Sequence, residues 1–452
     1  MPQTLAQQVA KRYAKLGYNQ LPAATRHSVK RLLLDYLGVA LAGSQSESGV
    51  IARRFAREQG SGAQSQLFGD LFGNKGKASM TAAAFANAIS SHSSELDDID
   101  VLALFHFSPP VYSSALAVAD ATHASGKDLI AALAAGCEMM ERVSRAANNS
   151  LRNRAFHTTP TCGVFGATIA ASKLLKLNAE KITHALGMAG AQASGLMEMY
   201  GPSMQKRFNP GPTARNGVTA ALMAQLGFTG ADTIFEGERG FLRAFTDKNS
   251  PERLVEGINK PYQLDIEFKP YSCARPIHNA IDCALAVRKQ PGFDVKKIKS
   301  IHFERHSDWA LYHQNKAPRT YHEAQVSLPF SVAVAFIEGQ ALLKQYSDRN
   351  IKNPLVKAIS NAHTITVNDK LPRGVSCKMT LKQTDGKTFM SQIDYPKGSI
   401  QNPMSDAELL AKFTSLASPV IGAPRAASLA SAVMQIEKAK NVSTVLKLMG
   451  KK

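Results

Sequence analysis

Residues 77–98 have the sequence KASMTAAAFANAISSHSSELDD, and this stretch sets the character of the chain. Its first part, residues 77–93, is rich in alanine, the residue with the highest helix propensity, and therefore predicts a helix. The helix leads directly into an acidic segment that begins at Glu95 and ends at Asp98. A helix C-terminus carries a partial negative charge and disfavours carboxylates, so acids crowded there point to a role in function.

The helical pattern continues on both sides of this stretch. Apolar residues at helical spacing predict a helix over 23–42, which Gly43 is expected to end. The same criteria predict further helices over residues 4–17, 110–124, 126–147, 160–176, 178–198 and 213–227. This part of the chain lacks the alternation of a strand, so we expect it to be all-helical.

A different pattern follows in the later part of the chain. Residues 375–383 and 387–394 alternate around Asp385-Gly386, which is a strong β-hairpin signal. The other expected elements are strands over 297–305 and 363–368, a short extended segment over 264–269, and helices over 276–288, 324–340 (closed by Gly339), 405–416 and 424–447. The fold class is thus predicted to be mainly α, with an all-helical domain over 1–266 and 400–452 interrupted by an α+β lid over 267–399. Clefts between such domains are common ligand sites.

Composition narrows the class of protein. The chain has 452 residues, of which 44% are hydrophobic and 20% charged, as in ordinary globular proteins of about two domains. It has neither an apolar run long enough to cross a bilayer nor a recognisable signal peptide. Its five cysteines are widely spaced and form no CxxC pair, so we expect a reduced, cytoplasmic protein without a zinc ribbon or an iron–sulfur cluster.

The charge pattern indicates a small anionic partner. The formal net charge is +19. Residues 267–399 contain 20 Lys and Arg against 11 Asp and Glu, which is +9, and the remaining residues therefore carry +10. Such a spread excess attracts anions in general, whereas nucleic-acid binders show a basic stripe, often with aromatics. We therefore expect a small acidic substrate, with no nucleic acid and no membrane as partners.

Cofactor motifs are missing from the sequence. It contains no Walker loop, no GxGxxG and no GxSxG, so we expect no nucleotide, no flavin and no serine-hydrolase triad. The acidic segment and its neighbours, His92 and His106, lack a metal motif such as HExxH, so we expect no metal there either. Two alternatives remain for this cluster: the rim of an active site, or a polar helix end with capping acids and surface histidines.

Three further segments carry candidate chemistry. His157 precedes an Ala/Gly-rich helix and suits a general acid or base, unless it is a hydrogen-bonded loop histidine. Lys206 lies in QKRFNPGPTARNG, residues 205–217, which predicts a shaped loop opening onto a helix near Thr213. A lysine there could bind a carboxylate or stabilise an enolate, although a lone lysine is usually solvated surface.

The third segment contains Arg275 and His278. An arginine can hold a carboxylate through two parallel hydrogen bonds, which makes Arg275 a candidate substrate ligand. His278 falls in the first turn of the following predicted helix, where the helix dipole lowers the pKa of an imidazole and favours its neutral form.

Taken in order, these segments resemble the MmgE/PrpD family over nearly the whole chain. The matching pieces are Glu95–Asp98, the His106 loop, Phe156-His157 before Gly163, Lys206 with Gly211 and Gly217, Lys269-Pro270-Tyr271 with His278 and Asp282, Tyr312, and Ser327-Leu328-Pro329-Phe330. The family includes 2-methylcitrate dehydratase, cis-aconitate decarboxylase and iminodisuccinate epimerase. The resemblance implies a helical domain with a smaller lid, a homodimer, and a cofactor-independent site between the domains.

The resemblance also implies site residues. The positions that match the family's active site are His106, His157, Lys206, His278 and Tyr312. Three positions depart from the family pattern: Glu95 stands where other members have Asp, Ile99 where they have Thr, and Phe107 where many have Pro. These departures lie at the substrate end of the site, so they bear on substrate and reaction more than on fold.

The family's reactions share a carbanion or enolate beside a carboxylate, formed by a base and stabilised by cations. We assign His157 and His278 as base and acid candidates, and Lys206 and Arg275 as ligands of substrate carboxylates. His106 and Tyr312 would orient the substrate or relay protons, and Glu95 or Asp98 would hold a substrate hydroxyl or a histidine tautomer.

The primary prediction is a hydro-lyase that dehydrates a 2-methylcitrate-like acid. An epimerase or racemase and a decarboxylase of a related polycarboxylate are the alternatives. A non-catalytic anion-binding protein is the alternative from another class.

Overall fold

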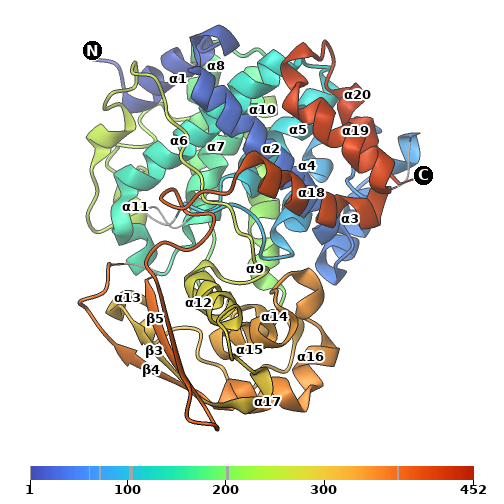
Figure 1. The fold of residues 1–452 in the computed structure, drawn as a ribbon. Coiled ribbons are helices and arrows are strands. Elements are labelled where there is room, and N and C mark those ends of the chain that lie inside the picture. The colour runs from blue at the N-terminus through green and yellow to red at the C-terminus, as the bar shows by residue number, and fades with distance from the viewer. Residues whose placement is uncertain are drawn as a thin grey trace.

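The computed structural model describes residues 2–60, 62–70, 73–100, 105–199, 203–373 and 376–451. Helices dominate, which confirms the predicted mainly α class. The helical body in the upper part of Figure 1 consists of α1 (Leu5–Lys15), α2 (Ala23–Ser44), α3 (Glu47–Glu58), α4 (Met80–His92), α5 (Ser108–Ala121), α6 (Gly126–Asn153), α7 (Thr158–Leu174), α8 (Ala179–Gly190), α9 (Gln205–Phe208), α10 (Pro210–Gln225), α11 (Phe241–Phe245), α18 (Asp406–Ile421), α19 (Ala423–Met434) and α20 (Ser443–Leu446).

The lower body in Figure 1 combines a sheet with helices packed beside it. Its helices are α12 (His278–Arg288), α13 (Ser307–Ala310), α14 (Tyr321–Gln325), α15 (Leu328–Glu338), α16 (Asp348–Lys352) and α17 (Pro354–Asn361). Its strands are β3 (Ile298–Arg305), β4 (His363–Val367), β5 (Cys377–Gln383) and β6 (Thr388–Ile393), in the spatial order β4-β3-β5-β6. Strands β3 and β4 are parallel, and the other neighbours are antiparallel.

The hairpin predicted around Asp385-Gly386 is confirmed. Strands β5 and β6 pair in register from Cys377 opposite Ile393 to Lys382 opposite Thr388. Gly386 has φ 85°, a left-handed conformation that glycine adopts without steric cost and that the turn requires.

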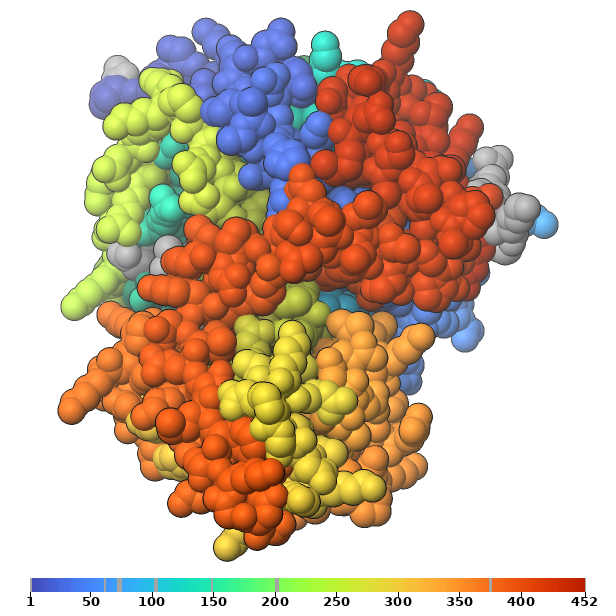
Figure 2. Space-filling view, in the orientation of Figure 1, coloured from blue at the N-terminus to red at the C-terminus, as the bar shows by residue number. Residues whose placement is uncertain are grey.

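Two buried hydrophobic clusters underlie the two bodies. The larger cluster draws on residues between Ala6 and Phe268 and again between Met404 and Met449. The second draws on residues between Cys273 and Phe389. On the face drawn in Figure 2, the orange-red segment that follows β6 crosses the junction onto the helical body. The domain limits set from the sequence stay a prediction, because a cluster of side chains does not fix where a domain ends.

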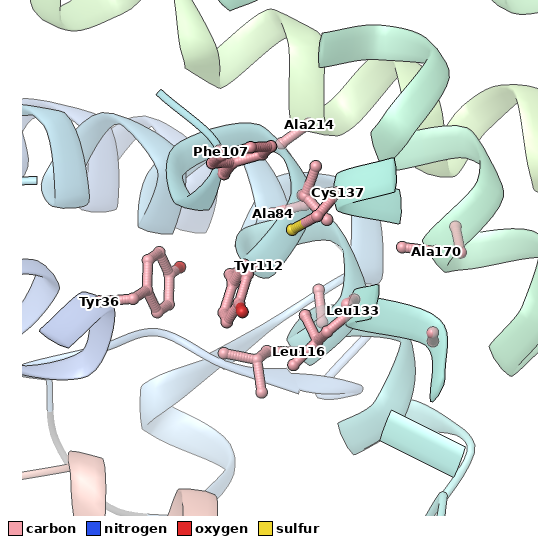
Figure 3. Close-up of a cluster of buried hydrophobic side chains, with 14 of the residues drawn as sticks. Tyr36, Ala84, Phe107, Tyr112, Leu116, Leu133, Cys137, Ala170 and Ala214 are labelled. Carbon is pink, nitrogen blue, oxygen red and sulfur yellow. The ribbon is translucent and has the colours of Figure 1, made fainter. Parts of the chain in front are cut away.

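Small residues let the central helices approach closely. Figure 3 shows part of this core, where alanines such as Ala84, Ala170 and Ala214 surround a few larger side chains. A Cβ added at Gly136 on α6 would lie 2.8 Å from the carbonyl oxygen of Gly166 on α7. The alanine-rich composition therefore serves helix packing as well as helix propensity.

Several predicted boundaries are wrong. Gly43 does not end α2, which continues to Ser44. The glycine is needed for a different reason, since a Cβ there would lie 1.8 Å from the carbonyl oxygen of Ser90 on α4. The predicted helix over 77–93 begins only at Met80, because Ser79 caps it.

Other differences concern short or divided elements. Residues 77–78 pair with 65–66 as two short strands, β2 (Lys77–Ala78) and β1 (Ser65–Gln66). The segment predicted as one helix over 424–447 contains α19, a 3-10 turn and α20, and the one over 324–340 is α15 preceded by α14. The 3-10 turns are Tyr18–Gln20, Gly73–Gly76, Pro251–Leu254, Arg275–Ile277, Val295–Lys297, Leu343–Gln345, Ile436–Lys438 and Lys447–Met449. Within the described ranges, every helix falls short of the length and apolar character that crossing a bilayer requires.

The contact between α2 and α4 can be tested with Gly43→Ala. The added methyl group would overlap the backbone of α4, so the free energy of unfolding should fall by about 1–3 kcal/mol or more, as for other overpacked cores. Urea unfolding followed by circular dichroism measures this change. Gly17→Ala is the matched control, because its Cβ would meet nothing closer than 3.5 Å. Equal stability of the two variants would contradict the close approach of α2 and α4.

Candidate active site

Two histidines and an aspartate form a buried group at the end of α4. Asp97 Oδ2 lies 2.7 Å from Nδ1 of His92, the last residue of α4, and 2.9 Å from Nδ1 of His106. His106 Nδ1 is also 2.5 Å from the carbonyl oxygen of Asp98. Because these oxygens only accept hydrogen bonds, Nδ1 of each histidine carries a proton, which leaves Nε2 as the nitrogen that faces away from Asp97. We call His92, Asp97 and His106 the histidine–aspartate group.

Burial and charge set the protonation of this group. Burial alone would raise the pKa of Asp97, but His106 and His92 hold it well below its usual range. Burial lowers the pKa of His92 to about 4, although Asp97 acts in the opposite direction. At neutral pH Asp97 is therefore ionised and His92 neutral. Among the described residues, none gives His92 Nε2 or Asp97 Oδ1 a hydrogen bond, although both atoms are buried.

The surface alternative for these histidines is wrong. His92 is 0% exposed and His106 is 7% exposed. The apolar run before His106, residues 101–104, lies outside the described residues. The three residues of the group also each offer a ligand atom within 4.8 Å of the others, a donor set that suits a divalent cation. The expectation of a metal-free site thus stays a prediction, and the chemistry below does not depend on a metal.

His157 lies beside this group and has a different partner. It precedes the first residue of α7, and its ring centroid lies 6.4 Å from that of His92. The side-chain amide of Asn209 donates a hydrogen bond of 3.0 Å to His157 Nδ1. Burial, followed by the charges of His92 and His106, holds the pKa of His157 well below its usual range. His157 is therefore neutral, with its proton on Nε2, the opposite tautomer to His92 and His106.

Three cations converge on one buried carboxylate next to the histidines. Glu95 pairs with the ammonium of Lys206, with Nη1 of Arg207, and with Lys269 Nζ at 3.2 Å. Burial would raise the pKa of Glu95, but these cations, Lys206 foremost, hold it well below its usual range. We call Lys206, Arg207 and Lys269 the cation cluster. Burial lowers the pKa of Lys206 to about 8, although Glu95 acts in the opposite direction.

The cation cluster and the histidines share one site. The positive charge of Lys206 depresses the pKa of both His92 and His157. Lys206 lies on the four-residue helix α9, and α10 begins already at Pro210. The loop predicted to open onto a helix near Thr213 is therefore wrong in detail. The predicted candidates Glu95, His106, His157 and Lys206 are nevertheless brought together.

Backbone strain accompanies this site. Glu95 has φ 55°, Ala155 has φ 65° and His313 has φ 65°, all in the left-handed region that side chains rarely adopt. Each such residue costs on the order of 1–3 kcal/mol and persists only where the surroundings enforce it. Ala155 lies two residues before His157. The charge of Lys206 also affects His313, because burial, then Arg305 and Lys206, lower the pKa of His313 to about 4.

Asp98 binds the start of α5. Its Oδ2 accepts a hydrogen bond of 2.7 Å from the backbone N–H of Phe107, and its Oδ1 accepts one of 3.1 Å from Ser108. Burial and the charge of Asp97 raise the pKa of Asp98. Asp98 thus binds the N-terminus of the helix that follows His106, which is a capping role of the kind expected if this segment is a polar helix end. Its role toward a substrate hydroxyl stays a prediction.

Arg275 and His278 form a second buried cluster at the lid. Arg275 Nε donates to Glu267 at 2.9 Å, and Nη1 lies 3.2 Å from His278 Nδ1. His278 Nε2 donates to the carbonyl oxygen of Cys273 at 3.2 Å. Burial, then Arg275 and Lys269, hold the pKa of His278 well below its usual range, so its ring is neutral. Both ring nitrogens of His278 are occupied here, and Arg275 is paired with a protein carboxylate.

Tyr312 is exposed in this conformation. Its side chain is 57% exposed, and its ring packs against Trp309 with centroids 5.5 Å apart. Its place in the site therefore stays a prediction.

Several residues of the site carried no separate signal in the sequence. Arg207 and Lys269 lie within quoted motifs, but nothing in their spacing shows that they meet Glu95. Gln325, at the end of α14, is fully buried and accepts from Arg207 Nη2 at 3.0 Å. Its amide donates to the carbonyl oxygen of Ser94 at 2.9 Å. This glutamine therefore links the lower body to Arg207, which binds Glu95, and to Ser94, which precedes Glu95 in the chain. Only the tertiary structure identifies it.

Comparisons with known proteins agree with this architecture. The model of the MmgE/PrpD N-terminal domain matches residues 7–254, and that of the MmgE/PrpD C-terminal domain matches residues 271–438. A cis-aconitate decarboxylase-like protein (oryM) of Aspergillus oryzae is 27% identical over 96% of this chain and 95% of its own. Cis-aconitate decarboxylases of Aspergillus terreus and Homo sapiens are 25% and 28% identical, over 96% and 93% of this chain and 94% and 89% of their own.

The tautomer of His157 can be tested with Asn209→Asp. A carboxylate in place of the amide would accept rather than donate, so it should move the proton of His157 to Nδ1 and raise the pKa of the ring. Nitrogen-15 NMR of labelled histidines across pH reports both changes. His184 on α8, whose Nδ1 lies 3.2 Å from the carbonyl oxygen of Gly230, serves as the internal control, and its nitrogen-15 signals should be the same in both proteins. A wild-type His157 protonated at Nδ1 would contradict the arrangement described.

Proposed function

The chain belongs to the MmgE/PrpD family, and on that premise we propose that it is a lyase acting on a small polycarboxylate with its own acid–base groups. The observation that carries the proposal is the cation cluster, held beside neutral histidines in a buried site. Cations in a water-poor setting bind carboxylates and stabilise an enolate more strongly than they would in water. The net positive charge of the chain would concentrate such anions around it.

The side chains support one common chemistry. Lys206, Arg207 and Lys269 hold the substrate carboxylates and stabilise negative charge on the one next to the reacting carbon. His106, polarised by Asp97, presents a basic Nε2, and His157 presents an Nε2–H donor. In decarboxylation the carbon–carbon bond to one carboxylate breaks, its electron pair passes into an enolate, carbon dioxide leaves, and a proton returns to carbon. In dehydration the base takes the proton next to a carboxylate and the acid protonates the departing hydroxyl.

Among these reactions we favour decarboxylation, because the similar proteins named above are cis-aconitate decarboxylases. Dehydration of a 2-methylcitrate-like acid, predicted first from the sequence, and epimerisation use the same enolate and differ in what leaves it. A non-catalytic anion-binding protein would need the cations, but it would not need His106 and His157 to carry their protons on different ring nitrogens.

Access to the site involves the lid. Glu95, Asp97 and His92 are fully buried, and Gln325 seals the lid against Ser94. Because these groups are buried, we infer that substrate entry involves separation of the two bodies at the polar contacts of Gln325. His278, Arg275 and Tyr312 belong to the lid side, and we assign them to the closing surface over the substrate. The homodimer implied by the family stays a prediction.

The proposal predicts turnover of a polycarboxylate. The protein is incubated in heavy water with 2-methylcitrate, citrate, cis-aconitate or iminodisuccinate, and each reaction is followed by proton NMR. A product one carbon shorter that has gained one deuterium on carbon identifies a decarboxylase. A new alkene from a hydroxy acid identifies a dehydratase, and deuterium uptake into an unchanged skeleton identifies an epimerase. Activity should survive EDTA. If all four compounds stay unchanged, the catalytic proposal fails for this set and anion binding becomes the better account.

Lys206→Ala should lower kcat/KM by about 10²–10³-fold, the usual effect of removing one group that stabilises developing negative charge. Circular dichroism and thermal unfolding establish whether the variant keeps its fold. Lys299→Ala removes an exposed lysine of β3 and is the matched control, with wild-type activity expected. Full activity in a folded Lys206→Ala protein would remove Lys206 from the mechanism.

The low pKa of Lys206 predicts a pH limit. With a pKa of about 8, the ammonium loses its proton as the pH rises through 8, so kcat/KM should fall on the alkaline side. Lys206→Arg keeps a positive charge at all accessible pH values and should shift this alkaline limb upward, even if its maximum is lower. An alkaline limb with the same midpoint in both proteins would assign the titration to another group.

A further inference from the structure

The charges around Glu95 do not balance within the protein. The cation cluster contributes three positive charges and Glu95 one negative charge, an excess of two. Side-chain exposure is 12% for Lys206, 3% for Arg207 and 1% for Lys269. Uncompensated charge is costly at such burial, because solvent cannot stabilise it. The other ionised carboxylate of the site, Asp97, accepts hydrogen bonds from His92 and His106 and forms no ion pair with Lys206, Arg207 or Lys269.

The hydrogen-bond donors are also in excess. Oε1 of Glu95 accepts from both Lys206 and Arg207, and Oε2 accepts from Lys269. Each lysine ammonium offers three donors. Arg207 Nε is buried, and none of the described residues accepts a hydrogen bond from it. The oxygens of a further anion would balance the positive charge and would also accept hydrogen bonds from the donors that lack an acceptor in the described part of the protein.

The carboxylate of Glu95 is held in the middle of this cluster. Its side chain is fully buried, and its backbone is strained into the left-handed region at φ 55°. The three cations bind both of its oxygens from α9 and from the domain junction. The carboxylate of Glu95 therefore occupies a position where a carboxylate of a bound substrate would contact the same three cations.

We propose that Glu95 is a specificity-determining residue that fills one carboxylate position of the cation cluster, so that the site prefers dicarboxylates to tricarboxylates. Two substrate carboxylates match the excess of two positive charges. A third would have to lie against Glu95 or Asp97, where like charges repel at low dielectric. This inference rests on the proposed function, namely that the site binds a polycarboxylate.

The test compares two unreactive anions that share a three-carbon chain. Glutarate carries two carboxylates and tricarballylate carries three. Their dissociation constants are measured by isothermal titration calorimetry at pH 7 with the full-length wild type, Glu95→Gln and Glu95→Asp. The wild type should bind glutarate more tightly. Glu95→Gln removes the resident charge and should move the ratio of the two constants at least tenfold toward tricarballylate, and Glu95→Asp, which withdraws the carboxylate by one methylene, should move it the same way.

Glu138→Gln is the matched control. Glu138 is also buried and ion-paired, with Arg142 on α6, but it does not contact the cation cluster. Its replacement should leave the ratio unchanged. If Glu95→Gln tightens both anions by the same factor, the effect is general electrostatics and the inference is overturned. If the wild type binds neither anion, the proposed function fails together with it.

Stability gives a second measurement should Glu95→Gln fold poorly. Among the described residues, Glu95 is the carboxylate that pairs with all three cations, so without it tricarballylate should raise the melting temperature of the variant by more than it raises that of the wild type. An equal increase in both proteins would overturn the inference, because the third carboxylate would then find no vacated position.

Discussion

The buried contact between Glu95 and the cation cluster ties the parts of this protein together. Lys206 and Arg207 come from α9, Lys269 comes from the junction of the two bodies, and Glu95 follows α4. Breaking a buried ion pair by removal of one partner typically costs about 3–5 kcal/mol, because the remaining charge is stranded. Segments that are distant in the sequence must therefore meet at Glu95 for the fold to form with its site assembled.

The same contact extends into the lid. Arg207 donates to Gln325, and the amide of Gln325 donates to Ser94, the residue before Glu95. A lid that lifts away from the helical body breaks these hydrogen bonds and frees one side of Arg207. If the protein acts as proposed, separation of the two bodies would also make the cations available to a substrate, so substrate binding and closure of the two bodies would favour each other.

The histidines illustrate how neighbours assign roles to identical side chains. His92 and His106 face a carboxylate and keep their protons on Nδ1, whereas His157 faces an amide N–H and keeps its proton on Nε2. Burial keeps His92 and His157 neutral. A base and a donor therefore exist side by side without any difference in side-chain type, and no pattern in the sequence distinguishes them.

The sequence by itself determined the class of fold and the residues around which the site is built. Alanine-rich periodicity and a hairpin turn are local properties, and they were enough to predict a mainly α chain with a sheet in its later part. The sequence identified Glu95, His106, His157 and Lys206 as candidates because these charged or titratable residues lie near the ends of predicted helices. Only the tertiary structure decided that Arg207, Lys269, Asn209 and Gln325 meet them, why Gly43 is a glycine inside a helix, and which nitrogen of His157 carries its proton. These depend on contacts between residues about 50 to 230 positions apart in the chain, and such contacts leave no trace in local spacing because they arise only when the helices pack.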